Sequence, residues 1–104
     1  MTAPHFMTRP LTSTPIGPLA SSIAVANQAV VVFAPGTIQN VADILNPVTA
    51  TEVLYVDIVG TAAAGSATSM ALQPGQAYRV SVPITTAVTA VAATAGHSFV
   101  AVSH

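Results

Sequence analysis

The chain has very little charge: of its 104 residues, 5% are charged, lysine does not occur, and the formal net charge is −1. A typical soluble domain has roughly 25% charged residues. The two arginines, Arg9 and Arg79, are too few to form a basic surface along a phosphate backbone, which argues against nucleic acid as a partner. Because a free monomer usually keeps a mixed, charged surface, we expect much of this surface to be covered by other protein. The alternative is a monomer with a surface of Thr, Ser, Ala and Gln.

Cysteine and tryptophan are also absent. Without cysteine there is no disulfide framework, thiolate nucleophile or zinc–thiolate site. The mean hydropathy is high, at +0.69, but no uninterrupted apolar run reaches the roughly 18 residues that a membrane helix needs. The N-terminus lacks the basic-then-apolar pattern of a signal peptide. The sequence therefore predicts no membrane partner, and a protein that is soluble, at least once assembled.

The usual arrangements of catalytic and metal-binding residues are missing. The histidines, His5, His97 and His104, lack the i, i+2 or i, i+4 spacing that builds a metal site within one chain. We expect all three histidines to lie on the surface. The alternative is that His5 or His97 from several subunits forms a ring around an oligomer axis. Asp57, His97 and Ser98 supply the residue types of a hydrolase triad, but neighbours in a strand point to opposite faces. With no nucleophile elbow and no glycine-rich phosphate loop, we expect neither enzymatic activity nor a cofactor.

Residues 1–18 contain four of the eight prolines, spaced so that no helix or strand can continue between them. This composition predicts an extended N-terminal arm with polyproline character. We expect the arm to contact a neighbouring subunit, although it could instead fold back on its own domain. The side chains expected to make the partner contact are Phe6, Met7, Arg9, Leu11 and Ile16.

The stretch 72–83, LQPGQAYRVSVP, predicts a turn followed by one half-buried strand. Proline presets φ for the second position of a β-turn, and glycine takes the positive φ that a type II turn requires next. Strict alternation follows, and Pro83 should end the strand because it has no N–H to donate. Tyr78, Val80 and Val82 should therefore face one side, and Ala77, Arg79 and Ser81 the other.

Short apolar segments separated by Gly, Pro and Asn predict further strands at 22–26, 29–34, 37–45, 53–59, 88–92 and 98–104. A helix at 20–30 and a helical turn within 37–45 are the alternatives. In 37–45 we expect Ile38 and Val41 to face inward, and 60–69 to be a loop. Segment 53–59 is apolar on both faces, so it should be central or lie in an interface. Its one carboxylate, Asp57, should pair with Arg79 or with backbone N–H groups.

This pattern of strands predicts an all-β fold, a small β-sandwich or jelly-roll-like barrel over residues 19–104, with the proline-rich arm in front. The second half of the chain also has a recognisable order. Strand 53–57 is followed by the loop GTAAAGSAT, the turn MALQPG, strand 78–82, the stretch TAVAATAGH and a final apolar strand. Over about residues 46–103 this order resembles the small β-rich structural proteins encoded among the head genes of tailed bacteriophages. The arm, the scarcity of charge and the lack of basic residues in 41–47 depart from that family.

The resemblance implies a non-enzymatic virion structural protein, and in particular a capsid decoration (cement) protein. Such a protein would lie on the outer surface of the phage head, bind the major capsid protein, and form a homo-oligomer, either a dimer or a trimer. One alternative is a neck, tail or fibre component of the particle. Another is a cell-surface β-sandwich that binds a ligand such as a carbohydrate. A self-assembling matrix or filament protein is a third, because exposed strand edges with few charges favour edge-to-edge pairing.

Overall fold

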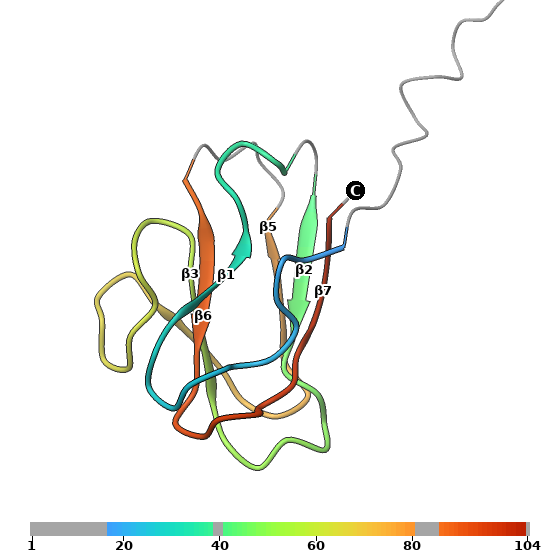
Figure 1. Ribbon diagram of the computed structural model, residues 1–104. Helices are drawn as coiled ribbons and strands as arrows, with labels where there is room; N and C mark the ends of the chain where they lie inside the picture. The colour runs from blue at the N-terminus through green and yellow to red at the C-terminus, as the bar shows by residue number, and fades with distance from the viewer. Residues whose placement is uncertain (1–16, 39–40, 81–85, 104) are drawn as a thin grey trace, which may run out of the picture.

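The computed structural model describes residues 17–38, 41–80 and 86–103, and in these ranges the chain forms strands and no helix. Two antiparallel sheets face each other, one with strand order β1-β6-β3-β4 and the other with order β5-β2-β7 (Figure 1). The predicted all-β fold is therefore confirmed as a small two-sheet sandwich. The strands are β1 (Val30–Phe33), β2 (Ala42–Leu45), β3 (Leu54–Asp57), β4 (Met70–Leu72), β5 (Ala77–Val80), β6 (Val88–Val91) and β7 (Val100–Ser103).

The core lies between the sheets and is built from alternate strand residues. Leu54 and Val56 of β3 are fully buried, as are Ala42 and Ile44 of β2 in the opposite sheet. β3 pairs with β4 on one side and with β6 on the other, which confirms the central position predicted for 53–59. All four residues of β6 are buried, so this strand is covered on both faces.

The turn and strand predicted in 72–83 are present in the part that the structure describes. Gly75 has φ +89°, and the Gln76 N–H donates to the Gln73 carbonyl at 2.9 Å. The turn takes the chain from β4 in one sheet to β5 at the edge of the other. Val80 is buried whereas Ala77 and Arg79 are exposed, as the alternation predicts. The expected end of this strand, at 81–83, lies outside the described residues.

The strand predicted at 22–26 does not form, and neither does the alternative helix at 20–30. Ser22 makes only an isolated bridge to Ser98, and Asn27 has φ 59°. The N–H of Ile23 donates to the His97 carbonyl, and the carbonyl of Ile23 accepts from Gly96. Because its partner is a turn and not an extended strand, this segment has no ladder along which to continue.

The inward positions predicted for 37–45 are only partly correct. Ile38 is buried as expected, but Val41 is half-buried and lies just before β2. Ala42 and Ile44 face the core instead, and a shift of one residue in a strand exchanges its two faces. On the outer face, Asp43 sits opposite Arg79 of β5 in the strand register and binds its guanidinium through both oxygens, at 2.7 and 3.0 Å.

Candidate functional site

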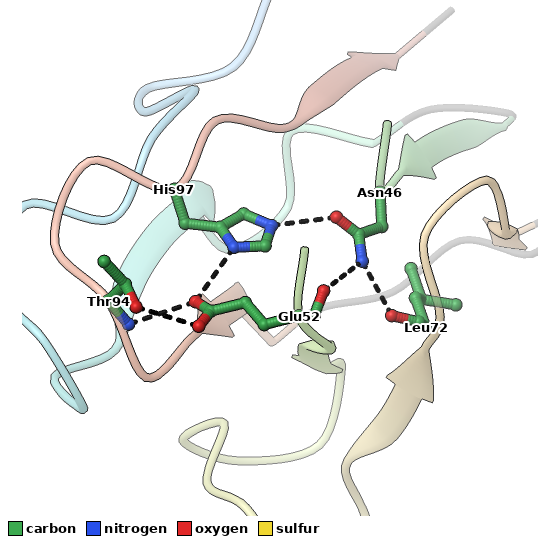
Figure 2. A network of polar contacts seen from close by, with 5 residues as sticks. All are labelled: Asn46, Glu52, Leu72, Thr94 and His97. Carbon is green, nitrogen blue, oxygen red and sulfur yellow. Dashed lines mark hydrogen bonds and ion pairs between the residues drawn. The ribbon is translucent and has the colours of Figure 1, made fainter. Parts of the chain in front are cut away.

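A network of polar side chains joins three segments that are distant in the sequence. Asn46 directly follows β2, Glu52 lies shortly before β3, and Thr94 and His97 belong to the connection between β6 and β7 (Figure 2). Because the neighbouring strands are short, the three connections that carry these residues meet at one end of the sandwich. This cluster, Asn46, Glu52, Thr94 and His97, is called the polar network below.

Asn46 is completely buried and its amide orientation is determined by its neighbours. Its Nδ2 donates to the carbonyl of Glu52 at 2.9 Å and to the carbonyl of Leu72 at 2.8 Å. Both protons of the amide nitrogen are therefore used, which turns Oδ1 toward Nε2 of His97, 2.8 Å away. The Asn46 side chain thus presents an acceptor to the histidine.

Glu52 presents a second acceptor to the same ring. Its carboxylate accepts from the Thr94 N–H at 3.0 Å and from the Thr94 hydroxyl at 2.8 Å, and Oε2 lies 3.0 Å from Nδ1 of His97. Hydrogen bonds from the Thr94 side chain, and next from His97, lower the pKa of Glu52 below its usual value. The carboxylate is therefore an ionised acceptor at neutral pH.

The His97 ring lies between these two acceptors, and its side chain is only 5% exposed, so the prediction of a surface histidine is wrong at this position. A neutral imidazole has one N–H, whereas an imidazolium has two. Both contacts of the ring are therefore satisfied only when it carries two protons. A histidine paired with a carboxylate also occurs in hydrolases, but there the second nitrogen serves a nucleophile. Here that nitrogen faces an amide oxygen.

A pocket with a volume of about 270 Å³ lies beside the polar network. One wall is formed by residues from 47–52 and the other by 94–98, so Glu52 and His97 contribute to opposite walls. The lining is small and rich in hydroxyl groups, with Thr49, Thr51 and Ser98 among its members. Phe and Tyr do not occur among the described residues that line it. The contact between Glu52 and His97 holds the two walls together.

A second carboxylate, Asp57, is buried at the end of β3 and organises the following loop. Its Oδ1 accepts from the N–H groups of Val59 and Gly60, both at 2.7 Å, and its Oδ2 accepts from the hydroxyls of Thr68 and Ser69 at 2.6 and 3.0 Å. Burial acts to raise the pKa of Asp57, but these hydrogen bonds outweigh it and lower the pKa to about 2. The predicted pairing with backbone N–H groups is correct, and the alternative with Arg79 is wrong because Arg79 binds Asp43.

Within residues 17–38, 41–80 and 86–103, no group of three or more His, Asp or Glu side chains is placed to hold a metal ion. The same ranges contain no helix that is long and apolar enough to cross a membrane. Of the histidines, His5 and His104 lie outside the described residues. The residues expected to contact a partner also lie outside them; these are Phe6, Met7, Arg9, Leu11 and Ile16.

Sequence reasoning found neither Asn46 nor Glu52 as members of a site. Asn46 precedes Pro47 and so indicates only the end of a strand. Glu52 is one of three acidic residues, with no motif around it. The three residues Asn46, Glu52 and His97 span more than 50 positions, and no local spacing rule connects them.

Comparison with known proteins gives no relative from which a function could be transferred. No protein-family model, curated protein or solved structure matches this chain. The likeness to phage head proteins therefore depends on the turn and strand pattern of residues 46–103, and the chain is assigned to no family.

Proposed function

We propose that this chain is a non-enzymatic virion structural protein, and specifically a capsid decoration protein that binds the major capsid protein and copies of itself. The proposal starts from the order of turns and strands described above. The strongest support comes from the surface of the sandwich. Its edge strands expose apolar side chains, and the charged side chains of the described residues already have partners within the chain. Such a surface suits association through apolar contact area.

The charged side chains of the described residues all have partners within the chain. Asp43 and Arg79 bind each other, Glu52 binds Thr94 and His97, and Asp57 binds its own loop. Because the formal net charge of the chain is only −1, we expect long-range attraction or repulsion between copies to be weak. Contacts made by this surface should therefore depend only weakly on salt.

Large apolar side chains are exposed on three of the four strands that end the sheets. These are Val31 on β1, Met70 on β4 and Val100 on β7, exposed by 43%, 46% and 54%. The fourth, β5, carries the charged Arg79. Buried apolar area contributes roughly 25 cal/mol per Å², so a few hundred Å² per copy would supply several kcal/mol before the cost of association. Repetition over a shell would multiply this effect through avidity.

The test is co-sedimentation of the purified protein with undecorated phage shells. We expect saturable binding at a fixed ratio to the shell subunits, with little change between low and high salt. A variant lacking residues 1–18 should bind more weakly if the predicted arm acts as a strap between subunits. Val100→Asp should also bind more weakly, whereas Gln28→Asp, at an exposed position without an apolar side chain and outside the pocket, is the matched control.

Absence of binding by the full-length protein would contradict the decoration function. Copy number in purified particles then tests the neck, tail or fibre alternative, because those structures contain few copies and a decorated shell contains many. Densitometry of the particle proteins on a gel distinguishes the two.

A ligand-binding β-sandwich is the second candidate, and the pocket beside the polar network favours it. Its volume of about 270 Å³ is near the small end of the range for ligand sites, which starts at roughly 300 Å³. Hydroxyl groups from Thr49, Thr51 and Ser98 could bind a polar ligand. Binding on a glycan array that is lost in Thr51→Val would support this candidate, and a blank array would count against carbohydrate as the ligand.

A further inference from the structure

We propose that His97 is a proton-dependent latch that joins the two walls of the pocket at the end of the sandwich. With two protons on its ring, His97 connects the segment 46–52 to the turn 94–97. Loss of one proton breaks one of the two contacts and weakens the attachment of the wall formed by 47–52, which then depends more on the two bonds from Thr94 to Glu52. This inference stands on the geometry of the polar network and does not depend on the proposed virion function.

Neither neutral form of the ring fits its surroundings. A ring with its proton on Nε2 would turn a lone pair toward the Glu52 carboxylate, 3.0 Å away. A ring with its proton on Nδ1 would turn a lone pair toward Oδ1 of Asn46, 2.8 Å away. Asn46 cannot reverse its amide, because Nδ2 already donates to the carbonyls of Glu52 and Leu72. A buried polar atom without a partner is costly, so the neutral ring should open one contact.

The pH response should come from His97 alone. The segments that meet here are 19–28, 46–52, 70–76 and 92–98, and the only other titratable side chain in them is Glu52. Hydrogen bonds from Thr94 and His97 lower the pKa of Glu52, so it stays ionised over the range in which a histidine titrates. Asp43 and Arg79 bind each other on the outer face of β2 and β5, and Asp57 is held by residues 59–69.

The backbone contacts indicate which wall moves when the latch opens. The turn 94–97 is attached to Ile23 by two backbone hydrogen bonds, of 2.7 and 2.9 Å. Those bonds do not involve the opposite wall. Asn46 is held to the turn after β4 through Gly75 and Gln76. Between Asn46 and β3, the side chain of Glu52 supplies the contacts to Thr94 and His97. The two bonds from Thr94 do not involve the ring, so segment 47–52 should loosen from the turn and open more often without detaching.

Hydrogen exchange measured by NMR on the full-length protein at about pH 5 and about pH 8 tests this latch. The Thr94 N–H donates to Glu52 and reports the closed state. Its protection, corrected for intrinsic exchange, should fall roughly five- to ten-fold at the higher pH. The N–H groups of Val59 and Gly60 are the internal control, because Asp57 is ionised at both values and their protection should not change. The ¹⁵N shifts of the His97 ring should show two N–H groups at the lower pH.

The matched variants separate His97 from the other two histidines. His97→Gln should remove the pH response of the Thr94 amide, whereas the double variant His5→Gln/His104→Gln should keep it. Equal Thr94 protection at both pH values in the natural protein would overturn the latch. So would a ring with a single N–H at about pH 5, or an unchanged response in His97→Gln. If His97→Gln does not fold, the number of N–H groups seen in the His97 ring spectrum of the natural protein still tests the latch.

Discussion

At the scale of single residues, the buried carboxylate of Asp57 shows how this chain keeps a charge away from water. Four donors surround it: two backbone N–H groups and two hydroxyls, from Thr68 and Ser69. Hydrogen bonds to the ionised form favour that form, which is why the pKa falls to about 2 although burial acts to raise it. The folded loop therefore depends on an ionised Asp57.

Acid should remove the stability that Asp57 contributes. The pKa of this group is about 2 when folded and 3.8 in its ordinary state, so its contribution is present above about pH 4 and is lost as the pH falls toward 2. The difference corresponds to about 2 kcal/mol. Urea unfolding of the natural protein and of Asp57→Asn between neutral pH and pH about 2 checks this. We expect the variant to be less stable by about 2 kcal/mol at neutral pH, with the gap closing in acid. A constant gap would contradict the assignment.

At the scale of elements, the turn before β5 decides how the two sheets are connected. It takes the chain out of β4 in one sheet and into β5 in the other, and it needs a residue with positive φ. Strand β5 then alternates between core and solvent, with Val80 inward and Ala77 outward. In the same turn, the Gln76 carbonyl accepts from the Asn46 N–H, and the Gly75 N–H donates to the Asn46 carbonyl. These two bonds connect the turn to the polar network.

Replacing Gly75 by alanine should destabilise the fold through backbone strain alone. Gly75 has φ +89°, while an added Cβ would meet the Val48 side chain at an ordinary 3.7 Å. We expect a loss of about 1–2 kcal/mol, the cost of a left-handed conformation for a residue with a Cβ. Gly60→Ala is the control: its Cβ would meet nothing and its φ lies outside the left-handed region. Equal effects of the two substitutions on urea unfolding would show that φ at Gly75 is not the cause.

The two faces of β5 should respond very differently to a negative charge. Val80→Asp would bury a carboxylate without a partner, and we expect it to cost roughly 3 kcal/mol or more, or to prevent folding. Ala77→Asp lies on the exposed face of the same strand and should change stability by less than about 1 kcal/mol. Circular dichroism and thermal unfolding of both variants provide the measurement. A Val80→Asp protein with an unchanged melting temperature would contradict the assignment of the faces.

At the scale of the whole molecule, a segment before β1 ties the two sheets together along one side. Leu19 donates its N–H to the Val32 carbonyl, and the Ser21 carbonyl accepts from Phe99, next to β7 (Figure 1). Together with the polar network at the strand ends, these contacts link the sheets in addition to the apolar core. All seven strands of the described chain lie between Val30 and Ser103.

Deletion of residues 1–18 should therefore leave a folded sandwich. Among the residues that the structure describes, the core runs from Ile23 to Ala101, which lies wholly after the deleted segment. We expect the far-ultraviolet circular dichroism spectrum to keep its β-type shape, with a change in stability of about 1 kcal/mol or less. A spectrum of an unfolded chain would show that the arm supplies contacts to the core.

The amino-acid sequence by itself determined most of the strands and some of their inner faces, but it did not indicate β4. Alternation in 77–80 predicted an inward Val80, and apolar residues on both faces of 53–59 predicted a central strand, because these patterns reflect local burial. The tertiary structure decided what local patterns do not encode. Ser22 pairs with a turn and not with a strand. In β2 the inward residues are Ala42 and Ile44, so the inner face is shifted by one residue from the predicted Val41. Asn46, Glu52 and His97 became neighbours only because folding brings three connections to one end, where buried polar groups must find partners among whatever lies next to them.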